Sequence, residues 1–319
     1  MARYLVTGGA GFIGSNLTAA LARQGDHVVV VDDLSTGHWS NLDALDRGPV
    51  EPVTADIRDA EAMAKAMRGV EVVFHHAALG SVPLSIEEPV RADSVNVGGT
   101  VQVLEAARHA GVRRVIFAAS SAAYGDEPSL PKSESSPIAP LSPYAVSKLA
   151  AERYCAVFSA LYGLETLCFR YFNIFGPHQR PDGAYAAAIP RFLWAALTGE
   201  LITIYGDGLT TRDFCFVDNV VAANLLAAST EKALRGDIVN IATGTSVTLN
   251  EAVEAIATHL GKGTPVRHEP ARTGDVRHSS ANIEKAKELL GYVPQCDLRQ
   301  GLPRTAEFLR ALSRQRESA

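Results

Sequence analysis

Runs of apolar residues recur along this chain, and stretches with helical periodicity separate them. Residues 28–31 are four consecutive valines, and uninterrupted apolar runs are typical of strands that are buried on both faces of a parallel sheet. Further strands are predicted at 4–6, 50–55, 70–75, 112–119 and 164–170, and helices at 12–21, 59–68, 89–110 and from 144 onward. Strands that alternate with helices predict an α/β fold with a doubly wound parallel sheet.

The alternation changes after residue 175. Pro177, Pro181 and Gly183 interrupt it, whereas residues 238–241 predict one more strand of the large sheet. Residues 184–199 predict a helix, 201–205 a strand, and helical patterns predominate from about residue 244. We therefore expect two interleaved domains. They are residues 1–175, to which 215–243 return, and a smaller mixed domain at 176–319.

A glycine-rich turn joins the first predicted strand to the first helix. Gly8, Gly11 and Gly14 would let the backbone approach a dinucleotide pyrophosphate, and the helix that follows offers free N–H groups and a positive dipole end. The spacing Gly-x-x-Gly-x-x-Gly differs from the commoner Gly-x-Gly-x-x-Gly. Taken alone, it also fits a glycine-rich turn of any α/β protein.

Asp32 follows the second strand, 18 positions after Gly14 (32 − 14). This is near the ~20 positions at which a carboxylate binds the adenosine ribose in dinucleotide-binding sheets. A carboxylate accepts a hydrogen bond from the 2′-hydroxyl and repels a 2′-phosphate, so we expect NAD rather than NADP. The alternative is a turn or cap residue, because strand ends often carry Asp.

Ser120 ends the fifth strand, and Tyr144 and Lys148 lie four residues apart on a predicted helix, hence on one face. A phenol with its ordinary pKa of ~10 is a poor base at neutral pH. An ammonium about 5 Å away would favour the phenolate by ~3 kcal/mol and lower the Tyr144 pKa toward pH 7–8. The alternative is a surface pair beside unconnected serines, but the glycine turn, Asp32 and this trio occur in the order that a catalytic site needs.

Composition limits the other possibilities. The net charge is −5 (30 − 35) and we find no long basic run, so neither nucleic acid nor an anionic membrane is an expected partner. No apolar run approaches the ~20 residues of a membrane span. The four cysteines are scattered without a C-x-x-C, and the chain enters its first strand without a signal peptide, so we expect a cytoplasmic protein. We expect no metal site, because His75 and His76 would point to opposite faces of a strand.

Eight segments together resemble the extended short-chain dehydrogenase/reductase family, and within it the UDP-sugar 4-epimerases. They are TGGAGFIG (7–14), VVDDLSTG (30–37), HHAALGSVP (75–83), SSAAYG (120–125), SPYAVSK (142–148), RYFNIFGP (170–177), GDGLTTRDF (206–214) and ARTGDVRHSSA (271–281). They follow one another over nearly the whole chain. GSVP, RYFNIFGP and DVRHS are most similar to the epimerases that prefer N-acetylated UDP-hexosamines or their uronic acids.

The resemblance implies a Rossmann sheet that binds NAD in the first domain and a UDP-sugar-binding second domain. It implies that Tyr144 takes the proton of the sugar 4-hydroxyl, bridged by Ser120, while hydride moves to a retained nicotinamide and returns to the opposite face of a 4-keto sugar. Lys148 would tune Tyr144 and bind the nicotinamide ribose. The implied cofactor-binding residues are Gly8, Gly11, Phe12, Ile13, Gly14, Asp32, Asp33, Asp56, Ile57, Ala77, Ala78, Asn96, Tyr144, Lys148 and Tyr171. The implied substrate-binding residues are Ser81, Ser120, Ser121, Tyr144, Asn173, Arg212, Arg272, Asp275 and Ser279.

Several positions separate this chain from relatives with other reactions. Dehydratases of this type carry Asp-Glu where this chain has Ser121 and Ala122, and decarboxylating relatives carry a Glu near Ala122. Uronic-acid 4-epimerases often have an arginine at the position of Pro83. Ser279 aligns with a position that is either a bulky Tyr or a small residue, and a Ser leaves room for a 2-N-acetyl group.

We therefore expect 4-epimerisation of UDP-GlcNAc/UDP-GalNAc, and also of UDP-Glc/UDP-Gal. A UDP-hexuronic acid 4-epimerase, a net oxidoreductase that releases NADH, and a nucleotide-sensing module without chemistry are the alternatives. Arg212 lies next to Asp213 and could instead form a surface ion pair. The resemblance also implies a homodimer packed through helices near 96–110 and 144–162, where Val157, Phe158 and Leu161 are either interface or core.

Overall fold

A seven-stranded parallel sheet forms the centre of the molecule, seen here in a computed structural model that describes residues 1–43, 45, 49–182, 186–271 and 276–317. The strand order is β11-β6-β5-β4-β1-β2-β3, so the order reverses between β1 and β4. The strands are β1 (Arg3–Thr7), β2 (His27–Asp32), β3 (Val50–Thr54), β4 (Val72–His75), β5 (Arg114–Ser120), β6 (Glu165–Tyr171) and β11 (Arg235–Ile241). This is the Rossmann order, and the predicted doubly wound fold is confirmed.

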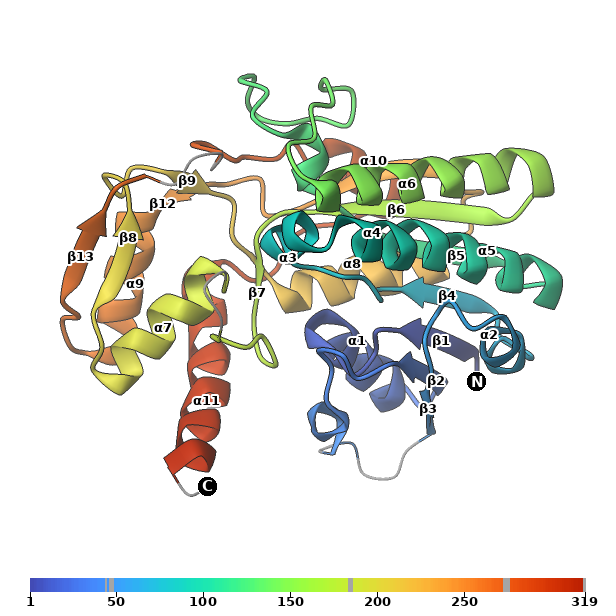
Figure 1. The fold of residues 1–319 in the computed structure, drawn as a ribbon, viewed down its shortest axis with the longest axis horizontal. Helices are drawn as coiled ribbons and strands as arrows, with labels where there is room; N and C mark the ends of the chain where they lie inside the picture. The colour runs from blue at the N-terminus through green and yellow to red at the C-terminus, as the bar shows by residue number, and fades with distance from the viewer. Residues whose placement is uncertain (44, 46–48, 183–185, 272–275, 318–319) are drawn as a thin grey trace.

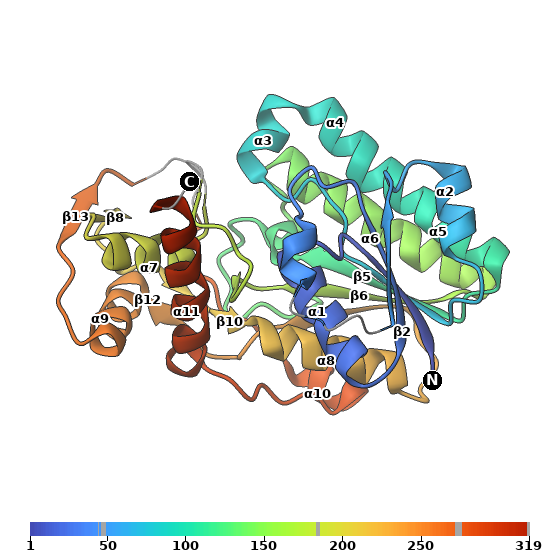
Figure 2. The ribbon, with the colours of Figure 1, turned by 90° about the horizontal axis from the view of Figure 1, so that it is seen from below.

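Helices cover both faces of this sheet (Figures 1 and 2). One face carries α1 (Phe12–Arg23), α8 (Val217–Ser229) and α10 (Glu284–Leu290), and the other carries α2 (Ala60–Ala66), α5 (Gly99–Ala110) and α6 (Pro143–Tyr162). The valines of β2 alternate between the two cores: Val28 and Val30 face α1, whereas Val29 and Val31 face α2 and α5. This two-sided burial explains why the valine run has no polar position.

The predicted helix at 89–110 is interrupted in the structure. It consists of α4 (Pro89–Asp93), a turn of π-helix η2 (Ser94–Gly98) and α5, and a short helix α3 (Val82–Glu87) that was not predicted precedes it. A Cβ at Gly99 would contact the outer atoms of the Ile57 side chain, so α5 packs closely on the loop after β3 at this position. Two 3-10 turns, η1 (Trp39–Leu42) and η3 (Ser121–Tyr124), complete this part of the chain.

A separate hydrophobic core forms the smaller lobe on the left of Figure 1. It is built by α7 (Ala188–Thr198), α9 (Leu249–Leu260) and α11 (Leu298–Glu317), with β8 (Ile202–Tyr205) paired to β13 (Val266–Glu269). Two short pairs join the lobes: β7 (Ile174–Phe175) with β10 (Cys215–Phe216), and β9 (Thr211–Arg212) with β12 (Val247–Thr248). The chain leaves the sheet after β6 and returns to it with β11, whereas the division at residue 175 stays a prediction.

No helix among the described residues has the length and apolarity needed to cross a membrane.

A buried ion pair fixes α6 to the sheet. The Glu152 carboxylate accepts hydrogen bonds from Arg170 Nε (2.9 Å) and Nη2 (2.7 Å), and each of the two side chains is 1% exposed. The Arg170 guanidinium also lies over the Tyr124 ring, 4.7 Å from its centroid. Because an unpaired buried charge is costly, this pair restricts how α6 can sit against β6. The same helix carries Tyr144 and Lys148 at its first turns.

Candidate active site

A cavity of about 400 Å³ opens at the carboxyl ends of the strands, beside the point where the strand order reverses. Open α/β sheets bind their ligands at this point. The residues predicted from the sequence that line it are Gly8, Gly11, Phe12, Ile13, Gly14, Ala78, Ser120, Tyr144, Lys148, Tyr171 and Asn173. The structure therefore brings the glycine turn and the catalytic trio to one cavity.

The glycine turn has the shape of an anion cradle. Gly8 has a left-handed backbone (φ +66°), and a Cβ at Gly14 would collide with the Gly8 carbonyl, so the helix packs closely on the turn. The N-cap of α1 is Gly11, which has no side chain to occupy the free N–H groups. A Cβ at Gly11 would meet the Gly8 oxygen at 3.2 Å. This bare helix N-terminus fits a pyrophosphate.

The Asp32 side chain, at the end of β2, is hydrogen-bonded to the glycine turn. Its carboxylate is 5% exposed and accepts hydrogen bonds from the backbone N–H groups of Ala10 and Leu34, both at 2.9 Å. Burial raises the Asp32 pKa, and these hydrogen bonds oppose that rise. Asp33 is exposed and accepts from Ser35 N (2.9 Å) and Oγ (2.6 Å). The ribose contact of these aspartates stays a prediction.

Six predicted cofactor residues do not line this cavity: Asp32, Asp33, Asp56, Ile57, Ala77 and Asn96. The Asp56 carboxylate pairs with the Arg58 guanidinium at 2.5 Å, and the hydrogen bonds from Arg58 lower the Asp56 pKa. The Ile57 side chain is buried in the core below α5. The N–H of Ala77 donates to Thr7 Oγ1 at 3.2 Å.

Asn96 is engaged in a structural contact. It is 1% exposed, its Oδ1 accepts from Leu79 N (2.7 Å), and its Nδ2 donates to Leu79 O (3.2 Å) and Ser147 Oγ (2.9 Å). These bonds join the loop after β4 to α6. Asn96 therefore fixes the loop after β4 against α6, next to the residues that line the cavity.

Tyr144 and Lys148 meet Ser120 because α6 begins beside the end of β5. Ser142 caps the helix, its Oγ accepting from Ala145 N at 3.2 Å. Lys148 is 4% exposed, its Nζ donates to the Ala118 carbonyl at 2.8 Å, and it lies 4.7 Å from the Phe117 ring centroid. Burial lowers the Lys148 pKa to about 8.

The predicted lowering of the Tyr144 pKa by Lys148 is wrong for this structure. Burial raises the Tyr144 pKa because it removes water from the phenolate, and a hydrogen bond with the Ser120 side chain opposes that rise. The Lys148 ammonium donates its hydrogen bond to the Ala118 carbonyl, and burial lowers the pKa of Lys148 itself. Tyr144 is therefore a neutral phenol here.

The two adjacent histidines have different surroundings. His75 is buried in the sheet, with Thr7 Oγ1 2.7 Å from its Nδ1 and Thr100 Oγ1 3.0 Å from its Nε2. His76, which was not predicted as a site residue, lines the cavity and stacks on Tyr171 with ring centroids 6.1 Å apart. Burial and the Lys148 charge lower its pKa to about 3, so it is neutral. No group of three or more His, Cys, Asp or Glu side chains within the described ranges could hold a metal ion.

A second cavity, of about 670 Å³, adjoins the first and shares Ser120, Tyr144, Tyr171 and Asn173 with it. Its other predicted residues are Ser121, Arg212 and Ser279. Much of its wall is apolar, formed by Val82, Pro83, Ile86, Ala122, Leu141 and Val276. The shared hydroxyl groups of Ser120 and Tyr144 therefore face both spaces.

The remaining predicted substrate residues do not line this cavity or are not described. Ser81 caps α3, its Oγ accepting from Leu84 N at 3.2 Å, and it is absent from the walls of the cavities described here. Arg272 and Asp275 lie outside the described residues.

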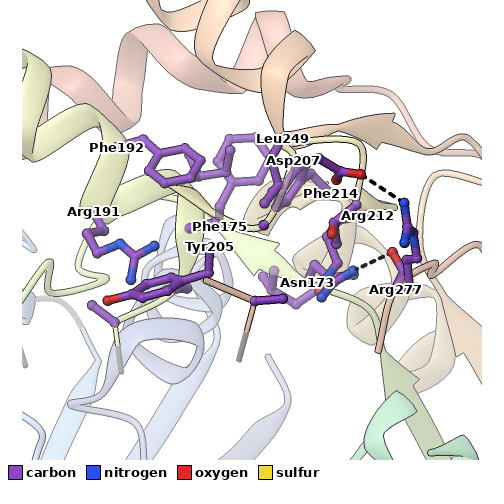
Figure 3. Close-up of a pocket in the computed structure, with 18 residues that line it drawn as sticks. Asn173, Phe175, Arg191, Phe192, Tyr205, Asp207, Arg212, Phe214, Leu249 and Arg277 are labelled. Atoms are coloured by element: carbon purple, nitrogen blue, oxygen red, sulfur yellow. Dashed lines mark hydrogen bonds and ion pairs between the residues drawn. The ribbon is translucent and has the colours of Figure 1, made fainter. Parts of the chain in front are cut away.

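A third cavity, of about 480 Å³, lies in the smaller lobe and shares Asn173 and Arg212 with the second (Figure 3). Its wall includes Phe175, Arg191, Phe192, Tyr205, Asp207, Phe214 and Arg277, which sequence reasoning missed. The Arg191 guanidinium lies 5.4 Å from the Tyr205 ring centroid, and Arg277 pairs with Asp207 at 2.9 Å. These residues come from distant parts of the chain. Phe175, Asp207, Phe214 and Arg277 lie within the segments that resemble the 4-epimerases, whereas Arg191, Phe192 and Tyr205 lie outside those segments.

The neighbour of Arg212 in the sequence is not available for a surface ion pair. Asp213 is fully buried, and its carboxylate accepts from Thr243 N at 2.9 Å and Gly244 N at 3.0 Å. Arg212 Nη1 donates to the carbonyls of Thr211 (2.8 Å) and Arg277 (3.3 Å) at the mouth between the second and third cavities.

Comparison with known proteins agrees with this geometry. The profile of the NAD dependent epimerase/dehydratase family matches residues 4–242. This chain belongs to that family. The predicted family and its NAD dependence are thereby confirmed.

Individual relatives match nearly the whole chain. The UDP-glucose 4-epimerase of Mycolicibacterium smegmatis is 42% identical over 311 residues, which is 97% of this chain and 98% of the relative. The structure of UDP-N-acetylglucosamine 4-epimerase from Methanobrevibacter ruminantium M1, in complex with UDP-N-acetylmuramic acid, has a TM-score of 0.93 and 36% identity, covering 98% of this chain and 99% of that one. The UDP-glucose 4-epimerase of Thermus thermophilus, in complex with NAD, has a TM-score of 0.87 and 36% identity, covering 97% of this chain and 99% of that one.

The buried Lys148 amine predicts a stability change. Its pKa falls from the ordinary 10.5 to about 8 on folding, so the charge costs about 3 kcal/mol at pH 7, where both folded and unfolded chains are protonated. Lys148→Met should raise the free energy of unfolding in urea by about that amount at pH 7. The gain should shrink as the pH rises above 8, because the folded chain then releases the proton, and vanish above about 10.5. Equal free energies of unfolding for the two proteins at pH 7 would show that the buried Lys148 ammonium does not destabilise the fold.

Proposed function

We propose that this protein is a UDP-sugar 4-epimerase that interconverts UDP-GlcNAc and UDP-GalNAc, and also UDP-Glc and UDP-Gal. One observation carries the proposal: Ser120 and Tyr144 line both the cavity that holds the anion cradle and the larger cavity beside it. A sugar hydroxyl in the larger cavity can then reach the phenol while the sugar carbon faces the cofactor cavity. The relatives named above, which match nearly the whole chain, support this choice.

The glycine cradle and the cavity below it suit NAD. Gly8, Gly11 and Gly14 would hold its pyrophosphate at the start of α1, and the buried end of the cavity at Lys148 and Tyr171 would hold the nicotinamide ribose and ring. NAD, when bound, supplies a hydride acceptor that can return the hydride. The Asp32 carboxylate at the end of β2 disfavours a 2′-phosphate.

Tyr144 is the proposed proton acceptor. Once ionised to the phenolate, Tyr144 would take the proton of the sugar 4-hydroxyl, with Ser120 hydrogen-bonded to both oxygens, and would give the proton back after the sugar has turned. A 4-keto sugar would be the intermediate, because loss of both this proton and the hydride at C4 leaves a ketone. Since burial raises the Tyr144 pKa, the proton transfer depends on positive charge near the phenol, and Lys148 is the cation that the helix places on the same face.

The larger cavity suits a sugar that must present both faces. Val82, Pro83, Ala122 and Leu141 offer no directional side-chain hydrogen bonds, so they would favour neither orientation of the ring. The third cavity would hold the nucleotide meanwhile. Its aromatic wall, with Tyr205 beside the Arg191 guanidinium, suits a flat base. Arg212, at the mouth between the two cavities, suits the diphosphate because a guanidinium binds phosphate oxygens bidentately.

Ser279 is the proposed specificity residue. It lines the sugar cavity, and its N–H donates to the Thr211 carbonyl at 3.1 Å, which fixes the backbone beside Arg212. A small hydroxymethyl side chain leaves room for a 2-N-acetyl group but does not exclude a 2-hydroxyl. Pro83 lines the same cavity where uronic-acid epimerases often carry an arginine, which favours a neutral sugar, whereas Lys132 and His278 of the same wall leave a hexuronic acid as the alternative substrate.

The homodimer is likewise a proposal. Val146, Tyr154, Val157 and Leu161 form an exposed stripe on α6 at helical spacing, with Leu161 69% exposed, whereas Phe158 is buried in the core. Of the three predicted positions, Val157 and Leu161 are therefore the ones that can meet a partner. An apolar stripe of this kind on a long helix suits a symmetric helix-to-helix interface.

Tyr144→Phe should lower kcat by about 10²–10⁴-fold, because it removes the acid–base group and keeps the ring. Its NAD content should not change. The C4 configuration of the product, followed by NMR, measures the turnover. Full turnover by the variant would remove Tyr144 from the mechanism.

Ser279→Tyr should reduce kcat/KM for UDP-GlcNAc by about 10- to 100-fold, because an aromatic ring would occupy the space of the acetyl group. Activity on UDP-Glc should persist, which serves as the internal control. Unchanged activity on both sugars would show that Ser279 does not set the preference.

Leu161→Glu should give a monomer in sedimentation-velocity experiments, because it puts a charge in the stripe on α6. Leu201→Glu is the matched control, since Leu201 is half-exposed in the smaller lobe, away from this helix. A variant at Leu161 that still sediments as the dimer would rule this surface out.

A further inference from the structure

A short segment after β7 ties the cofactor-binding helix to the smaller lobe. Residues 176–179 pass between α1 and α11, as both views show (Figures 1 and 2). Ser15 Oγ of α1 and His178 Nδ1 are 2.7 Å apart, and Asn16 Nδ2 donates to the Pro177 carbonyl at 3.0 Å. The edge of the His178 ring meets Phe308 of α11, with centroids 5.3 Å apart.

The same end of α1 makes an apolar contact with the smaller lobe. Phe12, the first residue of α1, lines the cofactor cavity and also packs against the core formed by α7, α9 and α11. Phe12 therefore connects the wall of the cofactor cavity to the core of the smaller lobe. Gln179, at the end of this segment, lines the same cavity as the glycine turn, and so do Asn173 and Ile174, which precede the segment.

The backbone of this segment is held in a conformation that it would not adopt alone. His178 is left-handed (φ +69°), a region that non-glycine residues rarely occupy. Such residues persist where the surroundings over-determine them, often at ligand clamps. The bond to Ser15 and the contact with Phe308 are the surroundings that fix His178.

We propose that Ser15 and Asn16, bound to Pro177 and His178, form a latch that retains NAD between the two half-reactions. The inference rests on the proposed function, in which the same NAD must stay bound until its hydride is returned. Because residues of this part of the chain line the same cavity as the glycine turn, separation of the segment from α1 would widen the cavity and let NAD leave. Separation breaks the Ser15–His178 and Asn16–Pro177 hydrogen bonds and uncovers Phe12.

The test measures exchange of bound NAD on the holoenzyme, with radiolabelled NAD as the probe and no sugar present. His178→Asn removes the ring but tolerates the left-handed backbone, and Ser15→Ala removes the hydroxyl. Each should accelerate exchange about tenfold, the factor that one buried hydrogen bond contributes. The double variant should exchange no faster than His178→Asn, because both changes break one bond. His109→Asn, at an exposed histidine of α5, is the matched control and should exchange like the unchanged protein.

Exchange within about twofold of the unchanged protein in both single variants would overturn the latch, and so would accelerations that multiply in the double variant. If His178→Asn fails to fold, Ser15→Ala and Phe308→Leu decide the question. A latch that serves retention alone leaves the KM for the UDP-sugar unchanged. A protein that retains NAD but converts no UDP-sugar would refute the proposed function and leave the latch standing, whereas normal turnover with rapid NAD exchange would refute only the latch.

Discussion

Buried charge under α6 is the constraint on which the site depends. Three charged side chains, Lys148, Glu152 and Arg170, lie within this helix and the strand beneath it, each nearly inaccessible to water. Glu152 and Arg170 satisfy one another, which fixes the helix on the sheet. Lys148 has instead a carbonyl and an aromatic face, weaker partners that leave its ammonium poorly stabilised. A cation held in this state at a cavity wall is a recurrent property of functional sites, because it gains most from whatever oxygen atoms a ligand brings.

The sheet and its order could be predicted because they follow from the local pattern. Val28 to Val31 have the pattern of a doubly buried strand, and the structure places alternate valines in two different cores. The glycine turn followed equally well, since the end of β1, the turn and the start of α1 are adjacent in the sequence. Tyr144 and Lys148 followed from their spacing of four residues at the start of a predicted helix. The turn of π-helix η2 at Ser94–Gly98 was not predicted, because the helical periodicity of 89–110 carries no local signal for it.

Properties that depend on burial in the folded protein could not be predicted from the sequence. The spacing correctly placed Lys148 on the same helix face as Tyr144. Whether the Tyr144 pKa rises or falls depends on how much water each group loses on folding, and burial raises this pKa where the sequence predicted a fall. Asn96 and Ser81 have side chains that suit a ligand, yet their hydrogen bonds go to the loop after β4 and to the start of α3. The third cavity was missed for a related reason: Arg191, Tyr205 and Arg277 become neighbours only when the smaller lobe folds.

Asn173 shows how one backbone position coordinates the three cavities. It lines all of them, has a positive φ of 40°, and its Nδ2 donates to the Asp213 carbonyl at 3.2 Å. The buried Asp213 carboxylate in turn accepts from the backbone at Thr243 and Gly244. Arg212 and Asn173 are thus both attached to Asp213, the first through the chain and the second through the Asp213 backbone carbonyl, so the walls of the second and third cavities are linked through one buried residue. In the proposed mechanism, a sugar that turns while its nucleotide stays fixed would use this link on one side and the apolar side chains of the second cavity on the other.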